Sequence, residues 1–346
     1  MGEGEIKSVS IRVLRGKKTI LNMRKVLLLF SLYCCTVACY SQIIKGQILD
    51  QYTDSTINYA SVYFNCTLVG TNTDKNGYFD LDVSKYSSMP LTISALGYHS
   101  VNLTNFSGDK VLSIHLTPKV FELNEVIVSA KGYAQSRRAY IRLFKQEFLG
   151  KTFNAMMCEI TNIDDIILKY DSTSYTLKAF SSKPILINNN RLGYKITYYL
   201  DTFEYCEPKG SLLLTGNYIF KEKFNSNKIR FENRRRTAYL GSRMHFFRCL
   251  WAGELKSNGF EIQNIHGMPA NYIIMERDST RKYIKYQGNL VVNYFQKSNG
   301  SVISVTKYVG YFDKQGYFDP LGISWNGEMA RQRIADQLPY EYEMKE

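Results

Sequence analysis

The clearest structural signal in the chain is the segment Gly70-Thr71-Asn72-Thr73-Asp74-Lys75-Asn76-Gly77-Tyr78-Phe79-Asp80-Leu81-Asp82-Val83. Its centre, residues 74–77, supplies Asn and Gly where a tight hairpin needs positive φ angles. Phe79, Leu81 and Val83 then alternate with polar residues, the period-two pattern of a strand that buries one face. The segment therefore predicts a β-hairpin.

The same alternation continues on both sides of this hairpin. Apolar residues recur at every second position in six further short runs, near residues 44–48, 62–64, 91–93, 101–103, 112–116 and 126–128. Short strands at a spacing of ~10 residues, separated by turn residues, are typical of an antiparallel sandwich. We therefore expect a mainly β protein whose residues 42–130 form a seven-stranded antiparallel β-sandwich.

Five motifs in this region resemble the carboxypeptidase regulatory-like domain, in the order in which that family has them. They are residues 44–50, 59–62, 70–79, 91–98 and 123–128. The last motif is similar to the C-terminal end of this domain type in proteins where the domain precedes a TonB-dependent outer-membrane receptor; it reads Leu123-Asn124-Glu125-Val126-Ile127-Val128. The resemblance implies a transthyretin-like β-sandwich that serves as an accessory module and has no catalytic role.

Carboxypeptidase activity does not follow from the resemblance, because it requires a zinc site of the H-x-x-E type. The histidines are His99, His115, His245 and His266, and none is followed three residues later by Glu. Since His115 alternates with apolar neighbours, we expect it on the outer surface. Asp74, Asn76 and Gly77 match the start of a calcium-binding loop. The Glu that completes such a loop is missing, so these residues are expected to form a turn. We expect no metal and no cofactor.

An export signal precedes the sandwich. Arg24 and Lys25 are followed by the apolar run 26–39, which as a helix spans ~21 Å and is too short for a bilayer core of ~30 Å. A basic start, a short apolar run and small residues predict a signal peptide at residues 23–41. Residues 1–22 are then an upstream extension; the alternative is one long basic leader.

Two processing routes remain open for this signal. Cleavage after Ser41 would leave small residues, Cys39 and Ser41, at the positions that a signal peptidase reads. Lipidation of Cys39 after Thr36-Val37-Ala38 would instead anchor the protein to a membrane. Either route predicts an exported protein in the periplasm, in the outer membrane or at the cell surface.

The region after the sandwich, residues 131–346, mixes helical and strand patterns. We expect a polar hinge at 131–138 and helices at 136–149, 233–256 and 328–337. Strands are predicted at 166–170, 174–180, 184–188, 194–205, 211–224, 271–276, 282–295 and 302–312. Because strands and helices do not alternate regularly, this pattern indicates an α+β region with an antiparallel sheet and two or three helices.

Charge suggests a class of partner without deciding it. The chain has a net charge of +13, and residues 42–346 keep +8, from 37 basic and 29 acidic residues. The predicted helix at 233–256 carries Arg234, Arg235, Arg236, Arg243 and Arg248. A basic helix face can bind an anionic membrane or glycan, but a solvated face is the commoner explanation. We expect an envelope protein or an anionic glycan or lipid as partner, and no nucleic acid.

No catalytic set of residues emerges. Ser324 lies in residues 322–327, which have one residue too many for the G-x-S-x-G nucleophile motif. Asp164 and Asp165 would point to opposite faces if they lay on a strand. The segment 313–319 repeats the pattern of 74–80, which indicates shared hairpin chemistry and not a duplicated domain.

Four cysteines follow the leader, Cys66, Cys158, Cys206 and Cys249, at spacings that match no metal motif. Free buried thiols are favoured, although one or two disulfides could form in an oxidising compartment. Together these features predict a non-catalytic exported envelope protein with a binding, accessory or scaffolding role. The alternatives are a hydrolase of glycan or peptide, or an accessory component of a TonB-dependent transport system.

Overall fold

The computed structural model describes residues 42–86, 88–106, 110–119, 130–223, 228–263, 274–276, 279–286, 288–295, 300–305, 310–320 and 322–344. The predicted leader, the motif at 123–128 with its strand, and His266 lie outside these residues.

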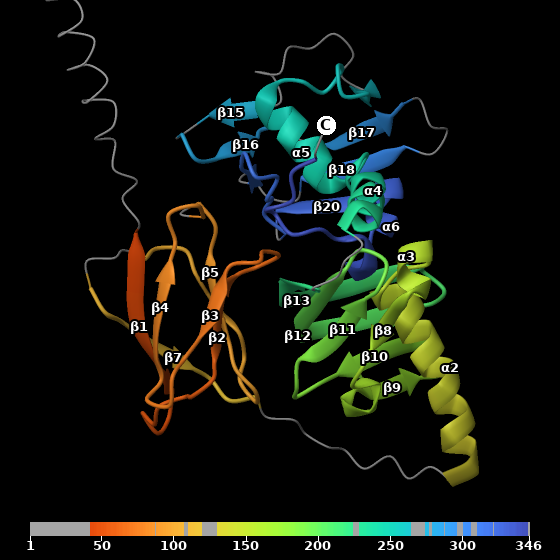
Figure 1. Ribbon diagram of the computed structural model, residues 1–346. Helices are drawn as coiled ribbons and strands as arrows, with labels where there is room; N and C mark the ends of the chain where they lie inside the picture. The colour runs from red at the N-terminus through yellow and green to blue at the C-terminus, as the bar shows by residue number, and fades with distance from the viewer. Residues whose placement is uncertain are drawn as a thin grey trace, which may run out of the picture. The chain divides into compact units, whose positions relative to one another are not determined.

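The N-terminal region forms two sheets (Figure 1). One has the order β4-β1-β7, and the other has the order β3-β2-β5-β6. The strands are β1 (Ile43–Asp50), β2 (Ser61–Phe64), β3 (Gly70–Asn72), β4 (Tyr78–Asp82), β5 (Leu91–Ser94), β6 (Val101–Leu103) and β7 (Leu112–Leu116). Seven strands between residues 43 and 116 confirm the predicted sandwich.

One strand pair departs from the antiparallel prediction. β1 pairs with β7 in parallel, with Gly46 opposite Leu112 and Asp50 opposite Leu116, whereas every other pair described in the two sheets is antiparallel. Alternation specifies which face of a strand is buried, but it does not specify the direction of its neighbour. The parallel pair was therefore beyond what the sequence pattern could predict.

The predicted alternating residues build the core of the sandwich. Ile44, Ile48 and Ile114 from one sheet are buried with Val62 and Ile93 from the other. At about 25 cal/mol per Å² of apolar surface removed from water, this face is the main stabilising feature of the domain. His115 lies on the outer side of β7 and its Nε2 is 3.0 Å from Oδ1 of Asp54, as its predicted surface position requires.

The two similar sequence segments fold as the same turn. Oδ1 of Asp74 accepts hydrogen bonds from the backbone N–H groups of Asn76 (2.9 Å) and Tyr78 (2.8 Å). Oδ1 of Asp313 accepts the equivalent bonds from Gln315 (2.9 Å) and from residue 317 (3.0 Å). The glycine in each turn has a positive φ, 76° and 86°. The shared hairpin chemistry is confirmed.

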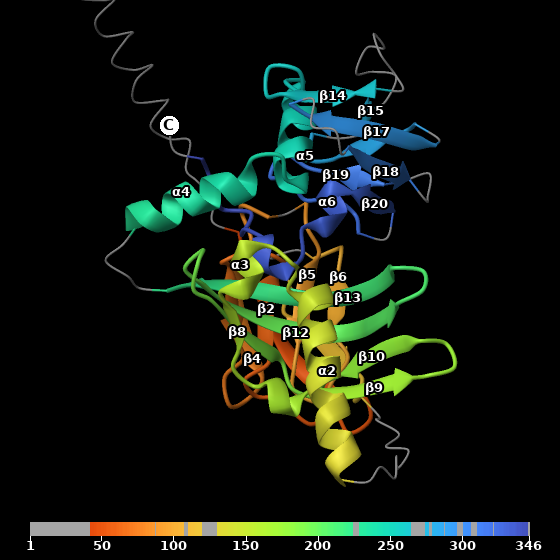
Figure 2. The same cartoon turned by 90° about the vertical axis from the view of Figure 1, so that its right-hand side faces the viewer.

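Residues 130–222 form a six-stranded antiparallel sheet together with helix α2 (Ala130–Phe148) (Figure 2). The order is β8-β11-β12-β10-β9, and β13 also pairs with β12. The strands are β8 (Cys158–Ile160), β9 (Ile167–Asp171), β10 (Thr176–Phe180), β11 (Ile185–Asn189), β12 (Tyr194–Cys206) and β13 (Ser211–Glu222). Phe144 and Phe148 of α2 are buried among the apolar residues of this sheet.

The hinge predicted at 131–138 is wrong, because α2 already begins at Ala130. The segment is polar, but Ala, Lys, Gln and Arg are good helix formers, and a polar sequence is compatible with the exposed turns of a helix. The predicted helix end at Gly150 is confirmed, since α2 stops at Phe148 and Gly150 has a φ of 106°.

The last part of the chain carries two smaller sheets, β14-β17-β18-β20 and β15-β16-β19. Their strands are β14 (Phe260–Ile262), β15 (Ile274–Glu276), β16 (Lys282–Ile284), β17 (Asn289–Tyr294), β18 (Ser301–Val305), β19 (Tyr311–Phe312) and β20 (Ile323–Gly327). The strands predicted at 282–295 and 302–312 are each divided between the two sheets. Alternation persists on both sides of such a break, so it does not reveal it.

Two predicted helices are also divided. The helix expected at 233–256 is α4 (Lys228–Tyr239) followed by α5 (Arg243–Ala252). Gly241, with a φ of 78°, interrupts it, and the hydroxyl of Ser242 caps α5 by accepting from the N–H of His245 (3.1 Å). The helix expected at 328–337 is α6 (Glu328–Arg331) and a 3₁₀ turn (Ile334–Asp336). A short helix, α3 (Phe153–Met156), was not predicted.

Candidate functional site

The sequence candidates for catalysis are not brought together. Ser324 is exposed on β20, and its hydroxyl donates weakly to the backbone carbonyl of Ser304 (3.4 Å). His245 lies on α5, where it is buried and its Nδ1 accepts from the N–H of Gly241 (3.1 Å). Ser324 thus lies on a strand, whereas the nucleophile motif requires a serine on a strand-to-helix turn.

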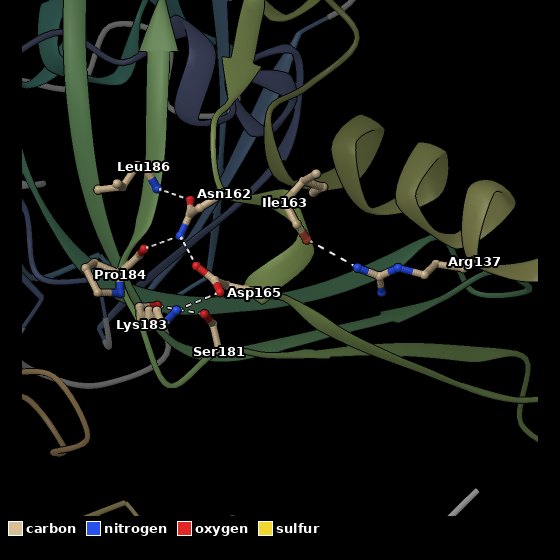
Figure 3. Close-up of polar contacts among 8 residues, drawn as sticks. All are labelled: Arg137, Asn162, Ile163, Asp165, Ser181, Lys183, Pro184 and Leu186. Carbon is tan, nitrogen blue, oxygen red and sulfur yellow. Dashed lines mark hydrogen bonds and ion pairs between the residues drawn. The ribbon is translucent and has the colours of Figure 1, made fainter. Parts of the chain in front are cut away.

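Asp164 and Asp165 lie on a 3₁₀ turn (Ile163–Asp165), not on a strand as assumed above. Figure 3 shows Asp165 turned toward Asn162 and Lys183, whose Nδ2 and Nζ donate to its carboxylate over 3.2 and 2.9 Å. The carboxylate of Asp164 is 95% exposed. These contacts lower the pKa of Asp165, chiefly through Lys183. Asp165 is thus engaged by Asn162 and Lys183, whereas Asp164 extends into solvent 3.7 Å from Arg137, so the structure gives the two acids no shared function.

Among the described residues, no three His, Cys, Asp or Glu side chains lie close enough together to hold a metal ion. Asp74, from the partial calcium pattern, uses its carboxylate on backbone N–H groups of its own turn. Cys66, Cys158, Cys206 and Cys249 are free thiols, and burial raises the pKa of Cys66 and Cys158 to about 12. Such thiols are poor nucleophiles at neutral pH.

The five arginines of the predicted basic helix do not share one face. Arg248 on α5 donates to three backbone carbonyls, and Arg243 donates to the carbonyl of Gln332 (3.0 Å). On α4, Arg235 pairs with Glu222 (2.8 Å), whereas Arg236 is exposed. Arg235, Arg243 and Arg248 thus make contacts within the protein. None of the described helices combines the length and apolar character needed to cross a membrane.

The described residues enclose a cleft of about 900 Å³. We call it the basic cleft. Its walls come from the α2–α3 junction (146–154), the β11–β12 turn, α4, β17, and residues 328–336. Figure 2 shows α3 at the upper end of α2, with α4 and α6 above it. Lys151, Arg191, Arg234, Arg331 and Arg333 line it, against three acids, Glu147, Glu328 and Asp336.

Each acid of the cleft already has a partner. Oε1 of the buried Glu147 lies 2.8 Å from Nζ of Lys151, an ion pair that lacks hydrogen-bond geometry, and Glu328 pairs with Arg331 over 2.9 Å. The buried carboxylate of Asp336 accepts from the hydroxyl of Thr152 and from Nδ2 of Asn154, both at 2.9 Å. Burial raises the pKa of Asp336, and these hydrogen bonds oppose that rise.

Three cations of the cleft have no such partner. Within the described part of the chain, no carboxylate lies within 4.0 Å of the guanidinium of Arg191, Arg234 or Arg333. Burial lowers the pKa of Arg333, and the charge of nearby Glu147 opposes this. An excess of unpaired arginine in a polar cleft suits an anionic ligand, because guanidinium groups bind carboxylates and phosphates in a bidentate manner.

No local pattern in the sequence indicates this cleft. The basic pattern of the predicted helix includes Arg234 with its helix neighbours, but it does not connect Arg234 with Arg191, Arg331 or Arg333. The lining residues are separated by up to 190 positions in the chain, so no local spacing connects them. The short basic run at residues 331–333 is the one sequence feature that could have indicated a site for an anion here.

The comparisons with known proteins bear on the sandwich alone. The family model of the CarboxypepD_reg-like domain matches residues 44–128. No curated protein matches the chain. A solved structure, the 9R-lipoxygenase from Cyanothece PCC8801, is 10% identical with a TM-score of 0.17, over 62% of this chain and 49% of the lipoxygenase. The chain thus spans about half of that protein, and the likeness carries no argument. Residues 44–128 form a CarboxypepD_reg-like domain.

Proposed function

We propose that this protein is a non-catalytic ligand-binding protein of the bacterial cell envelope. The basic cleft holds the ligand, and the CarboxypepD_reg-like domain has an accessory role. One observation carries the proposal: in the cleft every acid is partnered, whereas no carboxylate of the described residues lies within 4.0 Å of Arg191, Arg234 or Arg333. The cleft is also within the size range of small-ligand sites, ~300–1,000 Å³.

Export is supported by the leader at residues 23–41, with its basic start and short apolar run. In this proposal the processed chain begins at Gln42, or at a lipidated Cys39, and works in the periplasm or at the outer membrane. Burial would protect the free thiols of Cys66 and Cys249 in an oxidising compartment, while Cys158 and Cys206 are partly exposed.

Binding is favoured over hydrolysis by the state of the acids. Glycoside hydrolysis requires one carboxyl group as acid and a second as base or nucleophile, both facing the substrate. Glu147 and Glu328 are ion-paired and Asp336 is bonded to Thr152 and Asn154. A ligand in the cleft would therefore meet arginines before it met a free carboxylate.

A role beside a TonB-dependent receptor is a second candidate. The motif Leu123-Asn124-Glu125-Val126-Ile127-Val128 is similar to the end of this domain type where it precedes such a receptor. In this candidate the binding partner is a membrane protein, and the basic cleft is not required for the contact.

One experiment separates these functions. Tagged protein is recovered from detergent-extracted envelopes, and the bound carbohydrate, peptide and protein are measured for the wild type, Thr237→Trp and Asn233→Trp. Thr237 lines the cleft, whereas Asn233 is exposed on the same helix outside it. The proposal predicts a small bound ligand that Thr237→Trp removes and Asn233→Trp keeps. A receptor retained by all three proteins would favour the second candidate, and recovery in the cytoplasm would contradict both.

A further inference from the structure

We propose that Arg191 and Arg234 form a carboxylate-binding subsite, and that the ligand of the basic cleft is a short acidic saccharide. This inference rests on the proposed function and makes it more specific. Three observations support it: contacts that hold the two arginines in place, the residues that surround them in the cleft, and the absence of a described carboxylate within ion-pair distance.

Arg191 stands on a turn that buried contacts fix. Asn189 is fully buried, and its Oδ1 accepts from the N–H groups of Arg191 (3.2 Å) and Leu192 (2.9 Å). Its Nδ2 donates to the carbonyl of Ala335 (2.9 Å), which ties the turn to the segment that carries the lining residues Arg333 and Asp336. The guanidinium carbon of Arg191 lies 4.3 Å from the ring centroid of Phe153. Both the backbone and the head group of Arg191 are thus held in place.

Arg234 is held against the same turn from α4. Its Nη1 donates to the carbonyl of Arg191 (3.3 Å), while Nε of Arg235 donates to the next carbonyl, that of Leu192 (2.9 Å). A side chain at Gly193 would collide with Phe231 of α4, since an added Cβ would lie 2.7 Å from its ring. The helix therefore approaches the turn closely, and two arginines 43 positions apart become neighbours.

The subsite is prepared for a planar anion. One N–H of Arg234 is used by a carbonyl, and the guanidinium of Arg191 contacts a ring but no hydrogen-bond acceptor among the described residues, so most of their donors remain available. Because the side chains are already ordered, a ligand loses little of its binding free energy to fixing them. The planar donors of a guanidinium group match a carboxylate or a phosphate in bidentate geometry.

The rest of the lining favours a saccharide. Fourteen of the 24 lining residues are polar or charged, too many for a peptide anchored by apolar side chains. Thr152 and Asn154 already donate to Asp336. The side-chain oxygen of Thr237 and the amide nitrogen of Gln332 can still bond to hydroxyl groups, and Phe153 is 56% exposed. The volume of about 900 Å³ accommodates several linked rings. A sugar acid supplies both the hydroxyls and the carboxylate.

The test is calorimetric titration of the purified full chain with trigalacturonic acid. We expect binding that weakens as salt is added, because exposed charges are screened. Arg191→Gln and Arg234→Gln should each weaken binding by about tenfold or more, since a charge-assisted bidentate contact is lost. Arg236→Gln, two residues along the same helix and outside the cleft, should change binding less than about twofold.

Further arms separate the sources of affinity. Neutral galactotriose should bind at least about tenfold more weakly than the acid, and inorganic phosphate should compete weakly. Arg191→Lys keeps the charge and should fall between the wild type and Arg191→Gln, which guards against a variant that simply unfolds. Thr237→Trp should abolish binding of the acid.

Three results would overturn the inference: no binding of trigalacturonic acid, equal binding by Arg191→Gln, Arg234→Gln and the wild type, or equal affinity for galactotriose. Equal affinity for the neutral sugar, still abolished by Thr237→Trp, would leave the cleft as a binding site and remove only its acid specificity. Loss of all ligand retention in the envelope experiment would instead remove the proposed function.

Discussion

The hydroxyl of Ser88 donates a hydrogen bond to Oδ2 of Asp313 over 3.1 Å, and both side chains are buried. Ser88 belongs to the CarboxypepD_reg-like domain, whereas Asp313 opens the second of the two similar turns. Asp74 opens the first turn and makes the same backbone bonds from an exposed position. The second turn has therefore acquired a buried polar contact that the first does not need.

Removing this contact should destabilise the protein. Ser88→Ala leaves one buried oxygen of Asp313 without its hydroxyl donor, and such a loss costs about 1–3 kcal/mol. Ser84→Ala, at an exposed position four residues earlier, should cost less than about 0.5 kcal/mol. Urea unfolding of the two variants checks this, and equal stabilities would contradict it.

Acid should destabilise the fold through His245. Burial lowers its pKa from an ordinary value of 6.5 to about 4. As the pH falls from 6.5 to 4, the unfolded chain takes up a proton that the folded chain does not, so stability is lost. Asp313 has the opposite pH dependence. Burial raises its pKa to about 6, so the stability that its protonated form contributes to the fold is lost as the pH rises from 3.8 to 6.

His245→Asn isolates the histidine, because Asn can still accept from the N–H of Gly241 but does not titrate. The variant should be less stable than the wild type at pH 7.5, since it loses ring contacts with Phe260 and Tyr239. That difference should shrink as the pH falls towards 4. Urea unfolding over this pH range measures it, and a difference independent of pH would show that the histidine is not buried in its neutral form.

The glycine of the second turn should resist substitution. Gly316 has a φ of 86°, and an added Cβ would lie 2.8 Å from the carbonyl oxygen of Met244. Gly97 has a similar φ of 82° but open space around it. Gly97→Ala should cost about 1–2 kcal/mol for the left-handed backbone, and Gly316→Ala should cost more. Thermal unfolding of both variants tests the order, which would be contradicted if Gly97→Ala were the more damaging.

Arg248 should matter far more than Arg236. Arg248 donates to the carbonyls of Gln315 (2.9 Å), Tyr340 (2.9 Å) and Tyr342 (2.7 Å). A lysine ammonium cannot span all three, so Arg248→Lys should cost about 2–4 kcal/mol. Arg236→Lys, on an exposed side chain, should stay within about 0.5 kcal/mol of the wild type. Chemical unfolding of the two variants gives the comparison directly.

The sequence predicted elements where one local rule was sufficient. Alternation at Phe79 and Leu81 predicted β4, and the helix predicted at 136–149 corresponds to α2, in which Phe144 and Phe148 are buried at a four-residue spacing. The break between α4 and α5 had a visible signal, Gly241 followed by the cap Ser242, which a long apolar stripe obscured. The parallel pairing of β1 and β7 had no signal in the sequence, since the direction of a strand depends on the path of the chain between the two strands.

The candidate site depends on tertiary contacts that local patterns do not encode. Arg191 and Arg234 become neighbours because Asn189 fixes a turn and Gly193 admits α4 beside it. Sequence spacing predicts neither event. Spacing does bear on the zinc site of the H-x-x-E type, because that motif is local and none of the four histidines has a Glu three residues later.

The measurement that bears most directly on an exported, ligand-binding protein is native mass spectrometry of protein purified from the envelope fraction. We predict a chain that begins at Gln42, or at a lipidated Cys39, with a bound ligand that is missing from Thr237→Trp. A chain that retains residues 1–41 in the cytoplasm, or wild-type and Thr237→Trp proteins that both carry no ligand, would contradict the account.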